Sequence, residues 1–244
     1  MSASVRLDKL LANLGYGSRR DVNILVRNGK VSLDGATLKD SEQRIETTPD
    51  LPRRLLVAGE TLDPLPGLVL MLHKPVDFTC SHNEAGPLVY GLLPERWQRR
   101  DPPLSTVGRL DKDTSGLLLV TDDGPLLHRL ISPRANIPKT YLATLDRPLR
   151  GDGAEIFASG TLMLKGEDKP LMPAILAAVS DTCARVTVTE GRYHQIRRMF
   201  AATGNHVTSL HRESFGGLTL PRGLAAGLFA VLSASDIALL DAPQ

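Results

Sequence analysis

The sequence contains few cysteines and no long apolar run. Its two cysteines, Cys80 and Cys183, lie far apart in the 244 residues and show neither metal-ligand spacing nor a disulfide framework, which fits a reducing cytosol. No stretch approaches the roughly 18–20 apolar residues of a membrane-spanning helix, and residues 1–6 contain no apolar signal core. The composition therefore predicts a cytoplasmic protein that does not enter a membrane.

Several motifs of cofactor chemistry are also missing. The sequence has no phosphate-binding glycine loop, no dinucleotide-binding fingerprint and no convincing cluster of metal ligands. It contains no internal repeat and no low-complexity tract. Its length suits one large domain or two unequal domains with a substantial core.

Positive charge is slight overall but concentrated locally. The net charge is only +2, from 29 Lys and Arg against 27 Asp and Glu. Residues 19–30 contain four basic side chains against one acidic, and residues 128–150 and 185–212 each contain five against one. Because the remainder must be acidic, the pattern favours a directed basic surface that binds RNA over a set of ordinary solvated faces.

The N-terminal part of the chain predicts a small domain. Leucines repeat at helical spacing over residues 7–14, and Ser18 suits the N-cap of a second helix over residues 18–28. A short strand over residues 31–33 then leads into a tight Asp-Gly turn.

Proline and glycine mark the end of this small domain. Residues 47–66 are rich in proline and contain few apolar clusters. We therefore expect one domain over residues 1–60, a stiff linker over residues 61–67 and a second domain over residues 68–244.

The second domain is organised around residues 108–124. Four apolar residues at 117–120, stopped by Asp-Asp-Gly, predict a strand that is buried on both faces. The loop before it carries Arg109, Asp111 and Asp113. Polar side chains on a loop held against a buried strand are often functional, and a solvated surface loop is the alternative.

Further strands and helices are expected around this stretch. The patterns predict helices over residues 125–131, 154–160 and 194–203, and strands over residues 68–72, 140–145, 175–179, 185–189 and 206–210. Trp97 lies among arginines and is either a platform for a base or a half-buried anchor for its loop, and we favour the anchor.

Residues 6–35 resemble the S4 RNA-binding domain family. They contain Arg-Leu-Asp-Lys-Leu-Leu-Ala, then Ser-Arg-Arg, then Arg-Asn-Gly-Lys-Val and Asp-Gly, in the order and spacing of that family. The resemblance implies two helices that present a basic face to RNA phosphates. The residues implied in RNA binding are Arg6, Lys9, Arg19, Arg20, Arg27 and Lys30.

Residues 68–217 resemble the RsuA-type family of ribosomal RNA pseudouridine synthases. Five ordered motifs carry this resemblance, namely Lys74-Pro75, Gly108-Arg109-Leu110-Asp111 with Thr114-Ser115-Gly116-Leu117 and Thr121-Asp122-Asp123-Gly124, Lys139-Thr140-Tyr141, residues 190–199, and His211-Arg212 with Gly216-Gly217. The resemblance implies an α+β protein: an S4-like domain of helices and strands, then a catalytic domain built on a mixed, mainly antiparallel β-sheet with flanking helices.

The resemblance also implies roles for four residues. Asp111 would be the catalytic carboxylate, acting as nucleophile or as base, and Arg197 would keep it ionised. Tyr141 would stack on the uracil once the base has left its helix or loop, and Arg109 would fill the vacated space or contact phosphates. The reaction is an isomerisation without a redox change or group donor, so no cofactor and no metal is expected.

The expected substrate is ribosomal RNA. The Gly-Arg-Tyr-His-Gln form at residues 191–195 resembles the branch that acts on 16S rRNA, whereas the 23S branch more often has Gly-Lys-Asn-Arg-Gln. We expect a monomer that acts on 16S rRNA, either free or within a partly assembled small subunit. One departure from the family is Asp77, which stands where glycine is usual and is expected to alter a tight turn.

Three alternatives remain open at this stage. The same reaction could act on 23S rRNA, or the chain could be a non-catalytic RNA-binding assembly factor, although Asp111, Tyr141 and Arg197 together argue against the latter. A metal-dependent phosphodiesterase would instead use the carboxylates of Asp111, Asp113, Asp122 and Asp123. We expect Asp113, Asp122 and Asp123 to be structural, the last two in a turn that leads into a helix.

Overall fold

The computed structural model describes residues 3–241, which form two compact units. The first unit consists of Met1–Leu68, Leu93–Ser105 and Thr121–Gly124. It therefore includes two segments from the expected second domain, and Leu62 of the expected linker is a buried member of its core. Its elements are β1 (Ala3–Arg6), α1 (Leu7–Asn13), α2 (Arg19–Arg27), β2 (Val31–Leu33), β3 (Ala36–Thr37), β4 (Arg44–Thr47), α3 (Leu51–Arg54), β5 (Leu55–Val57), β6 (Glu60–Thr61) and the 3₁₀ helix η2 (Glu95–Arg99).

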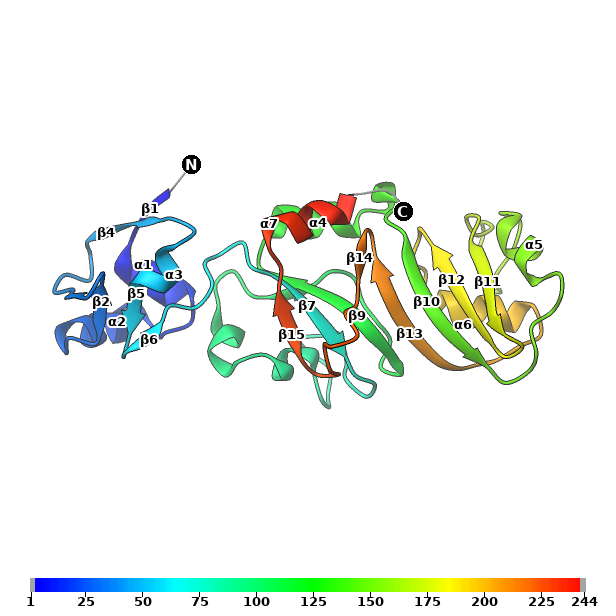
Figure 1. Ribbon diagram of the computed structural model, residues 1–244, viewed down its shortest axis with the longest axis horizontal. Coiled ribbons are helices and arrows are strands. Elements are labelled where there is room, and N and C mark those ends of the chain that lie inside the picture. The colour runs from blue at the N-terminus through cyan, green and yellow to red at the C-terminus, as the bar shows by residue number, and fades with distance from the viewer. Residues whose placement is uncertain (1–2, 242–244) are drawn as a thin grey trace. The chain divides into compact units, whose positions relative to one another are not determined.

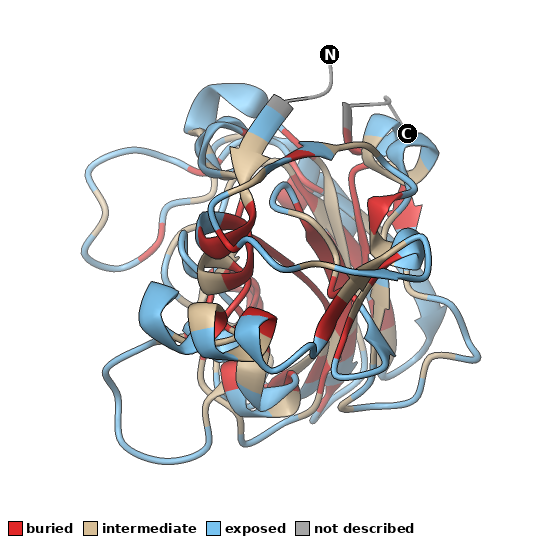
Figure 2. Cartoon of the chain, turned by 90° about the vertical axis from the view of Figure 1, so that its left-hand side faces the viewer, coloured by how far each residue is buried: buried red, intermediate tan, exposed pale blue. Residues whose placement is uncertain are grey.

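The two predicted helices of this unit are confirmed. Ser18 caps α2 through a capping box, in which its hydroxyl accepts from the Asp21 N–H and the Asp21 carboxylate accepts from the Ser18 N–H. The leucines of α1 and the valines of α2 are buried and form the core with the short strands. Buried residues are red in Figure 2. Because their apolar sides are buried, the basic residues of both helices are left on the outside, whereas Asp8 of α1 is buried.

The segment around Trp97 is part of the first unit. Trp97 is 7 % exposed, so the prediction that it anchors its loop is confirmed. Arg96 beside it forms an ion pair of 2.6 Å with Asp63 and lies over the ring of Tyr16. The Asp101 N–H donates to the Asn13 carbonyl at 2.8 Å. These contacts attach residues 93–105 to the N-terminal domain.

A buried ion pair joins the two inserted segments of this unit. Asp122 accepts from Arg100 Nε and Nη2 at 3.0 and 2.7 Å, and both side chains are 1 % exposed. Its other oxygen accepts from the N–H groups of Gly67 and Leu68, each at 2.8 Å. With four donors on its two oxygens, Asp122 has the structural role that the sequence predicted.

The second unit is a mixed, mainly antiparallel sheet with flanking helices, as predicted. Its order is β11-β12-β10-β13-β9-β7-β15, with β13 parallel to β9 and β14 paired to β13 (Figure 1). The strands are β7 (Val69–Lys74), β8 (Ser105–Thr106), β9 (Thr114–Thr121), β10 (Lys139–Leu145), β11 (Ile175–Ser180), β12 (Cys183–Val188), β13 (Val207–Phe215), β14 (Leu218–Thr219) and β15 (Phe229–Val231). The helices are α4 (Gly124–Ile131), α5 (Gly153–Ala158), α6 (Gln195–Ala202) and α7 (Ala234–Ala238), with 3₁₀ turns η1 (Val89–Leu92), η3 (Pro133–Ala135) and η4 (Leu239–Asp241).

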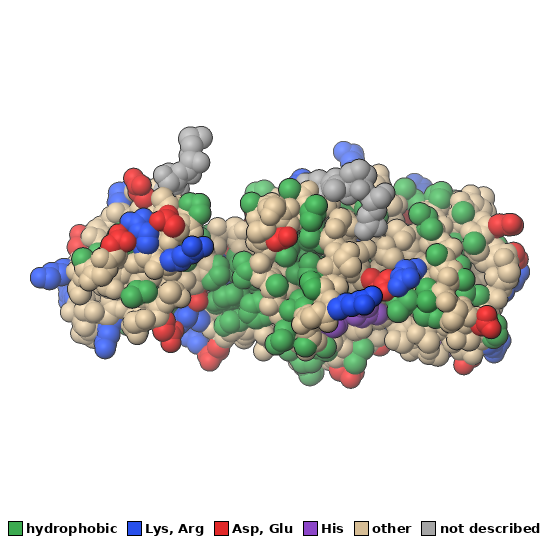
Figure 3. All heavy atoms as spheres, in the orientation of Figure 1, with side chains coloured by type: hydrophobic (Ala, Val, Ile, Leu, Met, Phe, Trp, Pro, Cys, Tyr) green, Lys and Arg blue, Asp and Glu red, His purple; other side chains and the backbone are tan. Residues whose placement is uncertain are grey.

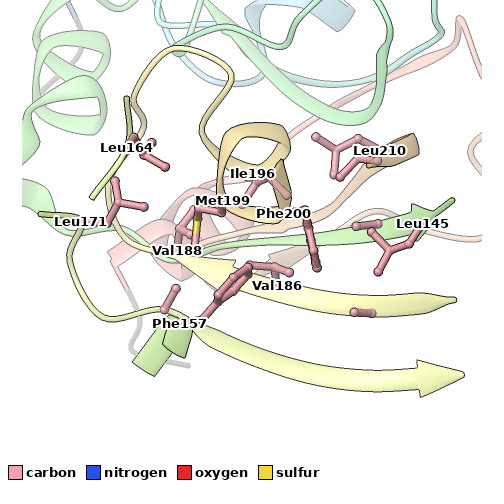
Figure 4. Close-up of a cluster of buried hydrophobic side chains, with 14 residues drawn as sticks. Leu145, Phe157, Leu164, Leu171, Val186, Val188, Ile196, Met199, Phe200 and Leu210 are labelled. Atoms are coloured by element: carbon pink, nitrogen blue, oxygen red, sulfur yellow. The ribbon is translucent and has the colours of Figure 1, made fainter. Parts of the chain in front are cut away.

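Helix α6 packs its predicted apolar side on the sheet. Ile196, Met199 and Phe200 point toward Val186 and Val188 of β12 (Figure 4). The spacing of these residues along the helix places them on one side, so burial of that side fixes how α6 is turned. Its basic residues therefore point elsewhere: Arg197 reaches the loop before β9, and Arg198 reaches Glu167.

Strands β9 and β13 approach so closely that only glycine fits at one position. Gly116 of β9 has a φ of +113°, and an added Cβ would lie 2.3 Å from the Arg212 carbonyl oxygen of β13. Strand β9 is buried along nearly its whole length, as the apolar run predicted. This pairing brings the loop before β9 beside β13.

Among residues 3–241, no helix is long and apolar enough to cross a membrane.

Candidate active site

A cavity of about 410 Å³ opens where the loop before β9 meets β10 and the start of α6. Asp111 lines it from the loop, Tyr141 from β10, and His194 from the residue that precedes α6. Leu210 of β13 and Ile196 of α6 add apolar surface. The cavity therefore combines the carboxylates of Asp111 and Glu190, several aromatic rings and a partly apolar wall, which suits a planar polar ring as ligand.

The Lys74 ammonium holds the loop that carries Asp111. Its side chain is fully buried at the end of β7, and its Nζ lies 3.0 Å from the Asp111 carbonyl oxygen. The same ammonium lies within 3.3 Å of three more carbonyl oxygens, those of Pro75, Lys112 and Thr114. Burial lowers the pKa of Lys74, and the surrounding carbonyl groups compensate for the lost water. The position of Asp111 thus depends on a side chain to which sequence reasoning assigned no role, although Lys-Pro after an apolar run was visible.

The nearest cationic partner of Asp111 is a histidine. His194 Nε2 lies 3.5 Å from Asp111 Oδ1, and the two groups form an ion pair only when the imidazole is protonated. The His194 ring also stacks on Tyr193, with ring centroids 3.9 Å apart. Tyr193 is 76 % exposed, so this pair forms an aromatic rim at the mouth of the cavity.

The prediction that Arg197 pairs with Asp111 is wrong in this structure. Arg197 instead forms an ion pair of 2.8 Å with Asp113, two residues further along the loop. Its Nη1 also donates to the Val207 carbonyl oxygen at 2.8 Å. Arg197 therefore ties α6 and β13 to the same loop, and Asp113, which the sequence left as structural, is its partner. Sequence motifs cannot resolve which of two aspartates in one loop a helix arginine reaches.

Tyr141 and Arg109 lie on two sides of the cavity. The Tyr141 ring is half-buried on β10, with the Arg212 guanidinium 5.9 Å from its centroid and Arg212 Nη1 3.5 Å from its hydroxyl. The Arg109 side chain is 66 % exposed and forms a surface ion pair with Glu84 at 3.2 Å. Arg109 can therefore move at small cost, because an exposed pair of this kind contributes little.

The third basic segment is mostly neutralised by acidic residues from elsewhere in the chain. Of its five arginines, four form ion pairs, namely Arg185 with Glu213, Arg192 with Glu167 and Glu190, Arg197 with Asp113, and Arg198 with Glu167. Counting charge along the sequence therefore overestimated the positive surface here. The fifth arginine, Arg212, is the exception among these residues.

The S4-like helices carry their basic residues on the outside. Arg6 is half-buried and paired with Asp8 and Glu42. The other five, Lys9, Arg19, Arg20, Arg27 and Lys30, are exposed, and within residues 3–241 the structure shows no ion pair for them. Their charges are thus available to solvent or to a ligand.

Comparison with known proteins identifies the family. The model of the RNA pseudouridylate synthase family matches residues 68–202, and that of the S4 domain matches residues 5–48. The chain is 40 % identical to the ribosomal small subunit pseudouridine synthase A of Escherichia coli K12 over 96 % of this chain and 99 % of that protein. This chain belongs to the RNA pseudouridylate synthase family.

Two further relatives agree with this assignment. The Yersinia pestis protein of the same name is 41 % identical over 98 % of this chain and 100 % of its own length. A crystal structure of a pseudouridylate synthase superposes with a TM-score of 0.68 at 35 % identity, covering 97 % of this chain and 99 % of that one. The synthase fold thus extends over both units of the chain.

Asp77 lies at a turn beside the active-site loop of this synthase. Its φ is +69°, a left-handed conformation that favours glycine, and its N–H donates to the Lys112 carbonyl oxygen at 2.8 Å. We expect Asp77→Gly to raise the free energy of unfolding by about 0.5–1 kcal/mol, because glycine relieves the strain. Chemical denaturation would measure this. Asp77→Ala is the control and should destabilise, and a stable Asp77→Ala variant would contradict the explanation.

A groove on the opposite face of the sheet contains two histidines. Successive residues of β13 point to opposite faces, so Leu210 and Arg212 face the active-site side, whereas His211 lines the groove with His73 and Glu213. Figure 3 shows histidine side chains beside basic and acidic ones on this face. His211 Nδ1 lies 2.8 Å from Ser115 Oγ on β9, so the groove touches the strand that follows the loop with Asp111.

This histidine should give the synthase a specific pH dependence of stability. Burial, the neighbouring His73 and, in the opposite sense, Glu213 leave the pKa of His211 below its ordinary value. The unfolded chain therefore binds a proton more readily, and stability is lost as the pH falls below about 6.5. We expect His211→Asn to lose less stability than the wild type when the pH falls from about 7.5 to about 5.5, an interval that spans the ordinary pKa of histidine. Equal losses in thermal unfolding of the two proteins would contradict this expectation.

Proposed function

We propose that this protein converts a uridine of 16S ribosomal RNA to pseudouridine. The observation that carries the proposal is the position of Asp111, whose carboxylate enters a cavity lined also by Tyr141, on a loop that Lys74 holds by four carbonyl contacts. Such a constellation suits a reaction that needs one fixed carboxylate against a flat ring.

The reaction breaks the bond between uracil N1 and ribose C1′ and forms a bond between C5 and C1′. The proton on C5 leaves, and N1 gains one, so atoms and electrons balance without a co-reactant. Asp111 acts on the sugar–base unit as nucleophile or as base. Tyr141 stacks on the uracil, which keeps the detached ring in place while it turns.

Two arginines support these steps in different ways. Arg109 is exposed and weakly paired, so it can leave Glu84 to contact phosphates or to occupy the space of the extracted base. Arg197 acts through the loop, because its ion pair with Asp113 and its bond to Val207 fix the chain next to Asp111. Arg197 is thus a positioning residue in this proposal.

The N-terminal unit supplies affinity for RNA. Five exposed cations on α1, α2 and the turn after them can neutralise phosphates without reading sequence.

The 16S assignment rests on relatives, since those of Escherichia coli and Yersinia pestis are both named for the small subunit. We propose that the protein acts as a monomer on 16S rRNA, free or in a partly assembled subunit.

Mapping of pseudouridines in rRNA tests this function. Cells that lack the protein should lose one pseudouridine from 16S rRNA and none from 23S rRNA, and the purified protein should release tritium from 16S transcripts labelled at uracil C5. Loss from 23S rRNA would redirect the proposal to the large subunit. A folded protein that binds RNA but releases no tritium from either rRNA would instead be an assembly factor.

A further inference from the structure

A second cavity adjoins the proposed uridine pocket in the catalytic unit. It measures about 330 Å³ and lies between β10, the end of α4 and the 3₁₀ turn after α4. Gly108, Arg109, Tyr141 and Arg192 line both cavities, so a polynucleotide can pass from one to the other without leaving the surface. The proposed reaction assigns nothing to this second cavity.

One wall of the cavity is cationic. Lys139 and Arg212 both line it, from the neighbouring strands β10 and β13. The Lys139 ammonium donates to the carbonyl oxygens of Ile137 and Thr189 at 2.9 and 3.3 Å. Because an ammonium has three N–H groups, one donor of Lys139 remains for a ligand.

Arg212 is a buried cation without a carboxylate. Its side chain is 2 % exposed, and its Nε donates to the Leu117 carbonyl oxygen at 2.7 Å. Its Nη2 is buried and has no hydrogen-bond partner among the described residues. Its Nη1 lies 3.5 Å from the Tyr141 hydroxyl, and the ring centroids of Tyr141 and Phe215 lie 5.9 and 5.5 Å from the guanidinium carbon.

The two cations lie close enough for their charges to repel each other. Burial first, and then the charge of Arg212, lower the pKa of Lys139 to about 8, while the charge of Glu190 acts in the opposite sense. Glu190 also lines the cavity, but its carboxylate already accepts from Arg192, Gln195 and the Met172 N–H. A buried cation beside a partly buried one, with a single nearby carboxylate that three donors already hold, is costly, and an anion between or beside them would offset that cost.

The facing wall is apolar. Leu130 and Ile131 of α4, Pro133 after it and Ile137 before β10 line this side of the cavity. Ile131 is 49 % exposed, so its side chain is available to a ligand at the entrance. A cavity lined by both cationic and apolar side chains matches the two halves of a nucleotide, the phosphate and the face of the base.

We propose that this cavity binds the nucleotide that adjoins the target uridine, with its phosphate against Lys139 and Arg212 and its base against the α4 wall. The assignment rests on the proposed function, because it takes the neighbouring cavity as the uridine pocket. It extends that function by giving the enzyme contacts with two successive nucleotides. A flipped uridine is then selected together with its neighbour, which no single-nucleotide pocket can do.

The test measures coupling between Lys139 and one phosphate of the RNA. The probes are short RNAs centred on the mapped uridine, each with a single uncharged methylphosphonate linkage at a different position. We expect one linkage next to the target to weaken binding to the wild type about fivefold, and to have no further effect on Lys139→Met, because each change removes the same contact. If the methylphosphonate and Lys139→Met weakened binding independently at every position, so that their fold-losses multiplied, the proposal would be overturned.

Two matched variants control for folding and for general charge effects. Ile131→Glu places a carboxylate at the cavity entrance, and because Ile131 is half exposed the variant should fold. His128→Glu introduces the same charge on the same helix at an exposed position that does not line the cavity. We expect Ile131→Glu to weaken RNA binding about tenfold more than His128→Glu, since like charges repel the phosphate. Equal weakening would contradict the proposed site.

A binding measurement that needs no turnover separates this inference from the proposed function. Affinity for a complete 16S transcript, measured over a series of KCl concentrations, should depend on salt less steeply in Lys139→Met than in the wild type, by about 1 in the logarithmic slope. If the wild type released no tritium but the two proteins differed in slope by this amount, the proposed function alone would be refuted. Normal tritium release with an unchanged slope would refute the subsite alone.

Discussion

Replacing Asp111 by asparagine is expected to lower turnover at least about 10³-fold while RNA binding stays nearly unchanged. Asparagine has the same shape but cannot act as nucleophile or base. The backbone carbonyl of residue 111 would still accept from Lys74, so the loop should keep its conformation. Tritium release under single-turnover conditions and filter binding of 16S rRNA would measure the two quantities separately.

Asp113→Asn is the matched control for this prediction. It lies in the same loop and loses the same charge, but its carboxylate pairs with Arg197 and does not line the cavity. We expect a loss of about tenfold, because the loop is held less firmly and no reacting group is removed. An active Asp111→Asn enzyme, or an Asp113→Asn enzyme that is equally inactive, would show that the catalytic carboxylate is assigned wrongly.

Replacing Lys74 by methionine is expected to cost about 3–5 kcal/mol of stability and most of the activity. The substitution leaves buried carbonyl oxygens of Pro75, Asp111, Lys112 and Thr114 without their donor, and each unpaired group costs about 1–3 kcal/mol before relaxation. For a unit of this size the melting temperature should fall by about 6–15 °C. Calorimetry and tritium release below the new melting temperature would measure both effects.

Lys112→Met separates the buried ammonium from lysine charge in general. Lys112 is exposed in the same loop, and its side chain contributes no hydrogen bond among the described residues. Its replacement should change the melting temperature by no more than about 1–2 °C. If Lys74→Met unfolded at the wild-type temperature and kept its activity, the loop would not depend on this contact.

The regular elements could be predicted because their signals are local. Helical spacing in residues 7–14, the Ser18 cap and the apolar run at 117–120 each depend on neighbours in sequence, and the structure confirms them as α1, α2 and β9. The family could likewise be inferred from ordered motifs. Such signals survive in one sequence because secondary structure and backbone turns are set within a few residues.

The pairing of side chains could not be predicted because it is set by tertiary contacts. Arg197 reaches Asp113 instead of Asp111, and Arg192 and Arg198 are neutralised by Glu167, which lies about two dozen or more residues away in sequence. The role of Lys74 was invisible for the same reason, since its acceptors are backbone carbonyls that any sequence has. Only the folded structure shows which side chains lie close enough to pair.

The first unit contains chain segments from both sides of residue 68, which limits where the chain can be shortened. A shortened chain that begins at residue 68 would keep Arg96 and Asp101 but lose their partners Asp63 and Asn13. It would also lose Gly67, one of the donors that satisfy the buried Asp122 carboxylate. Removal of the N-terminal domain would therefore leave a damaged catalytic fragment, and its low activity would be misread as loss of RNA affinity. Point substitutions of the exposed cations on α2 test the contribution of that domain without this artefact.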